Sequence, residues 1–187
     1  MAQPVTSLPP WQSAGIEPKR KYKYILNLGD IPAWVIKTSG RPNVNISEGA
    51  KHNFMAYEFK YPGKVTWDNV EITLVDPIDF DAAGQLLDVL KDAGYSTPSG
   101  WGAGDALAHR RTPSKRKFVN GNLGTVRIQV LNSDGETVET WSLNNTWISK
   151  VSYDDLDYGS EELLGIGLTL VYDWAELDIK NEFVTFE

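Results

Sequence analysis

The sequence LGIGLTLVYDW, residues 164–174, has the clearest alternating pattern in the chain. An apolar residue stands at every even position, and Gly165, Gly167 and Thr169 lie between them. A period of two residues predicts a β-strand that buries one face in a core. The small residues on the opposite face leave room for a neighbouring element to pack closely.

Strand patterns recur along most of the chain. Further strands are expected at residues 22–28, 33–38, 54–61, 65–75, 126–130, 137–143 and 147–153. Asp134-Gly135 lies between two of these segments and predicts a hairpin turn. Pro62-Gly63 is expected to end one strand, and the apolar positions change parity at Asp68-Asn69, which predicts a bulge.

One amphipathic helix is expected after Pro77. Its apolar stripe consists of Ala83, Leu86, Leu87 and Leu90. Asp79 or Asp81 can cap its start, and Gly94 stands where a left-handed terminator belongs. Many strands with one helix predict an α+β fold, mainly antiparallel β, in which two packed sheets form a barrel or sandwich flanked by that helix.

The chain is expected to form one domain with an appended arm. Residues 1–18 contain four prolines and little periodicity, which is typical of an N-terminal arm. The single domain is expected to span residues 19–187, with a long irregular inserted loop at about 95–124. Residues 39–53 are expected to form an exposed loop or a protruding hairpin.

The composition limits the classes of protein that fit. Because 41% of the 187 residues are hydrophobic, the chain can bury a sizeable core. The absence of cysteine excludes disulfides and thiolate metal sites. Since no signal pattern or apolar run of membrane-spanning length is found, we expect a protein that starts as a soluble cytoplasmic chain.

The charges are unevenly distributed along the chain. Basic residues gather at Lys19, Arg20, Lys21 and Lys23 and at Arg110, Arg111, Lys115, Arg116 and Lys117. Residues 154–187 contain ten acidic residues and only one lysine, Lys180. This separation favours surfaces of opposite sign that meet between copies of the chain, and an ordinary solvated surface is the alternative. The net charge of −7 argues against a duplex DNA-binding protein.

The sequence contains no convincing catalytic motif. The two histidines, His52 and His109, have no partner at metal-ligand spacing, and no Gly-x-Ser-x-Gly elbow is present. The glycine-rich run at residues 100–104 lacks the preceding strand and closing lysine of a phosphate loop. Adjacent acids such as Asp154-Asp155 are more typical of a solvated turn than of a calcium site. We therefore expect neither an enzyme nor a bound cofactor or metal.

Three segments carry a resemblance to a known family. PGKVTWDNVEITL, residues 62–74, resembles the segment before the helix in tail tube proteins of contractile-tailed bacteriophages. WISKV, residues 147–151, and IGLTLVYDW, residues 166–174, are similar to the last two strands of that family. The resemblance covers roughly residues 22–177 and consists of fold patterns.

The resemblance implies a structural virion protein. Six such subunits would join their sheets around a channel, and the rings would stack into a tube that conducts phage DNA. The implied partners are sheath, baseplate or tube-initiator, tape-measure and tail-terminator proteins, and assembly would occur in the host cytoplasm. An inner tube of a type VI secretion or other contractile injection system is the alternative within this class. An acidic channel wall would repel DNA phosphates.

Two exposed segments are candidates for contacts between subunits and rings. The candidate residues are Arg41, Asn43, Asn45, Glu48, Lys51 and His52 in the first segment and Arg110, Arg111, Lys115, Arg116 and Lys117 in the second. The acidic end of the chain, residues 178–187, could meet a basic patch on the next subunit. The alternatives are an ordinary surface loop, a nucleic-acid contact at the second segment, and a monomeric β-barrel module that binds a ligand near Trp101.

Overall fold

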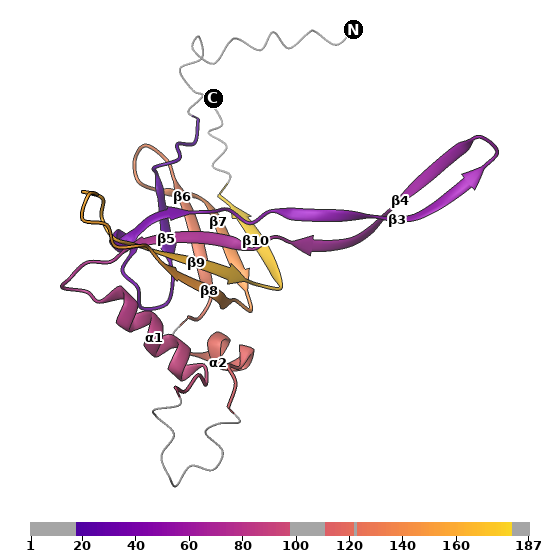
Figure 1. Cartoon of the computed structure of the whole chain (residues 1–187). Helices are drawn as coiled ribbons and strands as arrows, with labels where there is room; N and C mark the ends of the chain where they lie inside the picture. The colour runs from indigo at the N-terminus through magenta and orange to yellow at the C-terminus, as the bar shows by residue number, and fades with distance from the viewer. Residues whose placement is uncertain (1–17, 98–110, 122, 181–187) are drawn as a thin grey trace, which may run out of the picture.

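The computed structural model describes residues 18–97, 111–121 and 123–180, which form two four-stranded sheets, a two-stranded arm and two α-helices (Figure 1). The strands are β1 (Tyr24–Asn27), β2 (Ile36–Ser39), β3 (Val44–Phe54), β4 (Tyr57–Trp67), β5 (Val70–Val75), β6 (Val126–Leu131), β7 (Thr137–Asn144), β8 (Trp147–Tyr153), β9 (Gly165–Val171) and β10 (Trp174–Ile179). The helices are α1 (Ala82–Asp92) and α2 (Lys115–Asn120), and a short 3-10 helix, Ala33–Val35, precedes β2. The predicted fold class, mainly antiparallel β with packed sheets, is confirmed.

The first sheet has the strand order β1-β6-β7-β10, with every pair antiparallel. Its central hairpin, β6–β7, turns at residues 132–135, as Asp134-Gly135 predicted. The side chain of Asn132 accepts hydrogen bonds from the backbone of Asp134 at 3.0 Å and of Glu136 at 2.8 Å. Gly135 has φ +86°, a conformation that glycine adopts without strain.

The second sheet has the order β2-β5-β9-β8 and is also antiparallel. The register places Ile72 opposite Leu168, and both side chains are buried. On the other face, Thr73 lies opposite Gly167. A Cβ atom on Gly167 would lie 2.6 Å from Oγ of Ser152 on β8, so the close packing expected at this glycine comes from the neighbouring strand.

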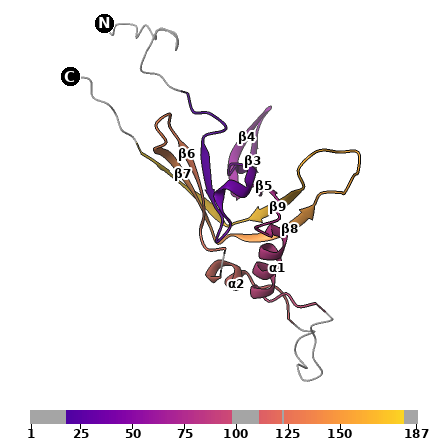
Figure 2. The same ribbon diagram turned by 90° about the vertical axis from the view of Figure 1, so that its left-hand side faces the viewer.

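The core lies between the two sheets and continues onto both helices. Buried residues of the first sheet, such as Leu26 and Ile128, belong to one cluster with Leu74 and Leu170 of the second sheet. The two sheets diverge from each other (Figure 2). α1 and α2 lie beneath the end where the sheets come closest together. Leu86 is the most deeply buried large side chain of α1.

The chain crosses between the sheets after β9, where the sequence predicted one continuous strand. β9 ends at Val171, and β10 joins β7 in the other sheet. Between them, Tyr172 is buried and its ring lies 6.1 Å from that of Trp67. Burial, and secondarily the charge of Asp68, raise the pKa of Tyr172 to about 12. The prediction of one continuous strand was wrong because Tyr172 is buried in step with the alternate residues of β9, although the backbone has already left that sheet.

The expected helix is present, and a second short helix accompanies it. Oδ1 of Asp81 accepts a hydrogen bond from the backbone N–H of Gly84 at 2.8 Å, so Asp81 is the correct one of the two predicted caps. Gly94, with φ +110°, ends it. α2 lies inside the segment that was expected to be irregular. Phe118 anchors α2 in the core, and six residues are too few to show a helical period.

The arm consists of β3 and β4, so the protruding hairpin is the correct alternative for residues 39–53. The predicted break at Pro62-Gly63 is wrong, because β4 runs through it and the hairpin turns at Met55, which has φ +53°. A two-stranded ribbon has a free edge on each strand, where proline loses no ladder bond. The predicted bulge at Asp68-Asn69 is instead the junction between β4 and β5, where the backbone N–H of Asp68 donates to the carbonyl of Asn43 at 3.0 Å.

Candidate assembly interface

The arm projects from the body as an isolated ribbon (Figure 1). Every residue of β3 except Gly49, and every residue of β4 except Trp67, is exposed. No residue of the two strands belongs to the buried core. A two-stranded hairpin without a packed face is marginally stable in water. Burial of the arm against another surface would therefore stabilise it.

One face of the outer half of the arm is aromatic. The register places Phe54 opposite Tyr57 and His52 opposite Phe59, and directly opposed side chains share a face. Tyr57 is 74% exposed, and Met55 at the turn is 88% exposed. This apolar face has the composition of an interface core, in which aromatic residues and methionine are enriched.

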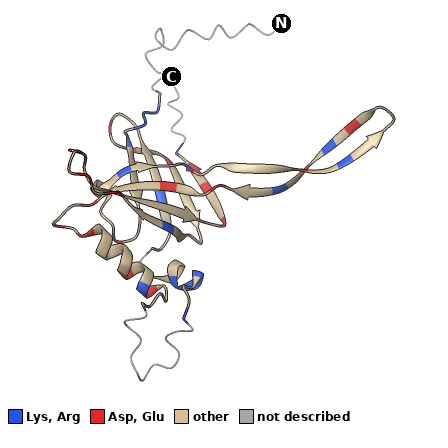
Figure 3. Ribbon diagram, viewed as in Figure 1, with Lys and Arg blue, Asp and Glu red and all other residues tan. Residues whose placement is uncertain are grey.

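The opposite face of the outer half is charged, since Lys51 lies opposite Lys60 and Glu58 follows on the same face. Figure 3 shows the charged residues along this part of the arm. Lys60 pairs with Glu48 at 3.2 Å, and Lys51 pairs with Glu58 at 3.3 Å and with Glu48 at 3.9 Å. All four side chains are largely in water, so each pair contributes little to stability. The charged face keeps this side of the ribbon solvated, which leaves the aromatic face as the side suited to a partner.

The inner half of the arm repeats this division between an apolar and a polar face. Val44 lies opposite Trp67, and Ile46 lies opposite Val65; except for Trp67 these side chains are exposed. On the other face, the Asn45 amide donates to Oδ1 of Asp68 at 2.5 Å. Both halves of the arm therefore present one uncovered apolar face.

Two glycines allow the halves to join. The register shifts on both sides of Glu48, and Gly49 and Gly63 meet there. A Cβ atom on Gly63 would lie 2.6 Å from Oγ of Ser47 and 3.1 Å from Cα of Gly49. A Cβ on Gly49 would lie 2.9 Å from the carbonyl oxygen of Pro62. The strands can approach this closely only without side chains.

A buried carboxylate fixes the root of the arm. Glu139 on β7 is 2% exposed, and it accepts hydrogen bonds from Lys19, from the indole of Trp141 and, at 2.5 Å, from Arg41. The guanidinium of Arg41 also lies 5.9 Å from the ring centre of Trp141. Burial alone would raise the pKa of Glu139, but the hydrogen bonds from Lys19 and Trp141 and the charges of Arg41 and Lys19 outweigh burial and lower it.

The predicted contact residues of the first segment gather at the arm. Arg41 and Asn43 lie at its root, whereas Asn45, Glu48, Lys51 and His52 all lie on β3. Arg41 is already paired with Glu139, so it is an anchor of the arm within one chain. His52 stands on the aromatic face, and Lys51 and Glu48 stand on the charged face.

The predicted residues of the second segment lie apart from the arm. Lys115, Arg116 and Lys117 are exposed on α2, beneath the sheets (Figure 3). Lys115 pairs with both oxygens of Asp173 at 2.6 Å, which holds α2 against the crossing from β9 to β10. Arg111 is exposed just before α2, and Arg110 lies outside the described residues.

The sheets end in strands without a described neighbour on their outer side. In the residues that the structure describes, the edge strands are β1 and β10 in the first sheet and β2 and β8 in the second. Such edges carry unpaired N–H and C=O groups and can accept a further strand. β8 is the longest of the four, with seven residues.

Sequence reasoning did not identify the aromatic face or the Glu139 site. The alternation of residues 54–61 was visible, but alternation alone does not distinguish a strand over a core from a strand in solvent. Lys19 and Glu139 are 120 positions apart, so no local pattern connects them. Across the described ranges, no group of three or more possible metal ligands is found, and no helix is long and apolar enough to cross a membrane.

Comparison with known proteins finds matches among solved structures. No family model matches the chain, and no curated protein matches its sequence. The cap of the anti-feeding prophage, described as its tube-terminating cap, matches with a TM-score of 0.64 and 16% identity, over 95% of this chain and 99% of that chain.

Two structures of an extracellular contractile injection system share the fold as well. Its sheath–tube complex in the extended state matches with a TM-score of 0.60 and 18% identity, over 92% of this chain and 99% of that chain. Its sheath/tube terminator matches with a TM-score of 0.59 and 16% identity, over 88% and 99%. The predicted resemblance is confirmed as a likeness of fold to tube and tube-terminator components of contractile machines.

Proposed function

We propose that this chain is a structural subunit of the tube of a contractile tail or contractile injection machine. In this proposal, copies of the chain associate into six-membered rings, and the rings stack around a central channel. The observation that carries it is the arm formed by β3 and β4, whose apolar faces have no partner among the residues that the structure describes. The fold shared with tube-associated proteins supports it.

The arm supplies the contact between copies. Its apolar residues would be buried against the body of a neighbouring copy, which favours association at about 25 cal/mol for each Å² of apolar surface removed from water. The proposed contact residues on the arm are Asn45, Glu48, Lys51 and His52, now joined by Phe54, Tyr57 and Phe59 on the aromatic face.

Pairing of sheet edges closes the ring. An edge strand such as β8 can extend its sheet by pairing with an edge strand of the next copy. In this proposal the partner is a different edge strand and the contact repeats head-to-tail, which closes into a ring when the rotation permits. The residues on α2, Lys115 to Lys117, remain proposed contacts with an adjacent ring or sheath.

The proposed setting is a phage tail, whose tube would conduct DNA into the host. The proposed partners are sheath, baseplate or tube-initiator, tape-measure and tail-terminator proteins. The alternative is an inner tube of a secretion or extracellular injection system, which the likeness to an extracellular contractile injection system favours. A channel wall that proves strongly basic would contradict DNA conduction, because phosphates would adhere to it.

A second candidate role is that of the tube terminator, which the likeness to the anti-feeding prophage cap favours. A terminator would form a single ring, whereas a tube subunit forms rings that stack. The two roles therefore differ in the size of the assembly.

Negative-stain electron microscopy of the purified chain, with sedimentation velocity over a range of concentrations, tests the proposal. We expect sixfold rings of a 20.9 kDa chain that stack into hollow tubes. Single rings at every concentration would favour the terminator role. A monomer at every concentration, also when mixed with a preformed tail baseplate, would overturn both roles and favour the monomeric binding module.

A further inference from the structure

A basic groove opens beside the root of the arm. It has a volume of about 880 Å³ and runs between residues 19–24 on one side and residues 33–43 on the other. Leu26, Ile36, Ile128 and Val130 form its apolar lining. Six lysine and arginine residues and no acidic residue line it. The groove therefore suits a segment that is both acidic and apolar.

Four of the six cations have no acidic partner in the part of the chain that the structure describes. Lys19 and Arg41 pair with Glu139, and Lys23 donates to backbone carbonyls at the β6–β7 turn. The remaining three, Arg20, Lys21 and Lys37, are exposed and form no described ion pair. They leave an uncompensated positive charge along the rim of the groove.

The loop between β8 and β9 has the complementary character. Residues 154–164 are all exposed and contain five acidic residues and no basic residue. None of the five forms an ion pair within the described chain. The loop also exposes apolar side chains: Leu156 is 86% exposed, and Tyr158 is fully exposed. Its shape is held by its own bonds, among them the backbone N–H of Gly159 to Asp157 at 2.9 Å.

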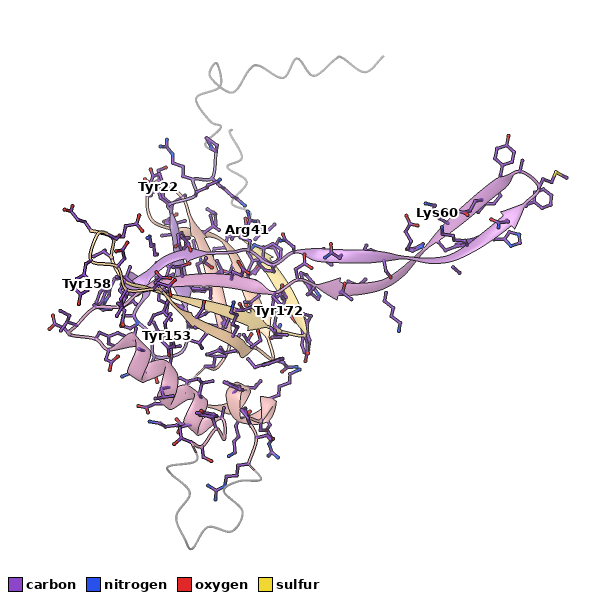
Figure 4. All side chains as sticks on the ribbon, viewed as in Figure 1. Tyr22, Arg41, Lys60, Tyr153, Tyr158 and Tyr172 are labelled. Atoms are coloured by element: carbon purple, nitrogen blue, oxygen red, sulfur yellow. The ribbon has the colours of Figure 1, made fainter. Side chains whose placement is uncertain are left out.

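We propose that the β8–β9 loop of one copy docks into the basic groove of the next copy. Within one chain, no residue of the loop lines the groove. In Figure 4, Tyr158 marks the loop on the side of the body away from the arm, and Tyr22 and Arg41 mark the groove. The loop and the groove lie on different parts of the body, so copies can join head-to-tail, which is the arrangement that ring closure requires. This inference rests on the proposed function and specifies the surface by which neighbouring copies recognise each other.

Charge reversal on the full chain tests the contact. The loop variant carries Asp155→Lys, Glu161→Lys and Glu162→Lys, and the groove variant carries Arg20→Glu, Lys21→Glu and Lys37→Glu. Each variant is expected to weaken self-association at least tenfold at low salt, with a smaller effect at high salt because ions screen the attraction. The variant that combines all six substitutions is expected to recover most of the affinity, because a basic loop then faces an acidic groove rim.

A matched control separates a specific contact from a general charge effect. Asp134→Lys with Glu136→Lys changes charge at the β6–β7 turn, outside the loop and the groove lining. This control is expected to assemble as the unchanged protein does. An equal loss of assembly in the control, or no recovery in the combined variant, would overturn the proposed contact.

Cross-linking tests the same contact by position. The chain has no cysteine, so Tyr158→Cys in one preparation and Lys37→Cys in another provide one thiol each. Under oxidation the mixture is expected to give disulfide-linked dimers of one variant with the other, in preference to dimers of two identical variants. If the unchanged chain assembles but no such dimer forms, the docking contact is wrong and the proposed function stands. If the unchanged chain never self-associates, both are overturned.

Discussion

At the root of the arm, the carboxylate of Glu139 carries its charge where water has almost no access. Its two cationic partners come from different segments of the chain: Lys19 precedes β1, and Arg41 precedes the arm. Both cations keep about half of their side-chain surface in solvent. Loss of the carboxylate would therefore leave them hydrated, while the carboxylate itself depends on them.

Glu139→Gln is expected to lower the free energy of unfolding by about 1–2 kcal/mol at pH 7, because charge-assisted hydrogen bonds become neutral ones. The pKa of Glu139 in the folded state is lower than its ordinary value of about 4.3. The stability that the charged carboxylate provides is therefore complete at pH values above the ordinary pKa. This stability is lost as the pH falls through the lowered pKa. Urea unfolding of both proteins from pH 7 to pH 2.5 measures the difference, which should narrow in acid.

The control for this prediction is Glu136→Gln, which changes an exposed acid at the start of the same strand region. It should change the free energy of unfolding by less than about 0.5 kcal/mol. A difference between Glu139→Gln and the unchanged protein that stays constant down to pH 2.5 would contradict a lowered pKa.

At the scale of elements, the arm depends on the contact between its two glycines. Gly63→Ala places a methyl group against Ser47, whose hydroxyl accepts the backbone N–H of Lys64 at 2.9 Å. We expect amide hydrogen exchange across residues 44–67 to become about tenfold faster, with exchange of the body unchanged because the arm is not part of the core. Exchange measured by mass spectrometry reports both. The exposed substitution Ala50→Ser is the control and should leave the arm unchanged.

The aromatic face of the arm gives a prediction about association. Tyr57→Ser with Phe59→Ser should weaken self-association tenfold or more, since each buried aromatic side chain contributes about 1.5–3 kcal/mol. Glu58→Ser with Lys60→Ser on the opposite face is the matched control and should have a smaller effect, because neither residue is a proposed contact. Sedimentation velocity over a range of concentrations measures both. Equal losses in the two variants would show that the arm does not bind through its aromatic face.

Elements with local signals were predictable from the sequence. The cap at Asp81, the terminator Gly94 and the turn at Asp134-Gly135 each depend on residues within a few positions, and the structure confirms all three. The arm was predicted only as one of two alternatives, because strand alternation in β4 resembles that of a core strand. Whether a strand is covered by core depends on the rest of the fold, which local sequence does not encode.

The candidate interface was predictable in part for the same reason. Residues 39–53 are polar and interrupted by glycine and proline, which predicts an exposed segment, and most of β3 lies within it. The aromatic residues of β4 were assigned to a strand and not to an interface. α2 escaped detection because Phe118 is its one fully buried anchor, and the crossing at Tyr172-Asp173 continues an unbroken alternation.

At the scale of the whole molecule, the body and the arm are separable in structure. The buried cluster consists of residues from the two sheets and the helices and the segments beside them, and among the described apolar residues of the arm Trp67 alone packs against it. The body should therefore fold without the arm, whereas the proposed assembly should not form. This difference distinguishes a role in association from a role in folding.

A shortened chain tests that difference. Residues 46–65 are replaced by Asn-Gly, which joins Asn45 to Thr66 by a two-residue hairpin turn and keeps the contact of Trp67 with Tyr172. We expect the free energy of unfolding of the body to change by less than about 1 kcal/mol, because few core contacts are removed. Electron microscopy and sedimentation should show a folded monomer in place of rings. If the shortened chain still forms rings as readily as the full chain, the arm is not the main contact between copies, and the sheet edges and the basic groove must account for association.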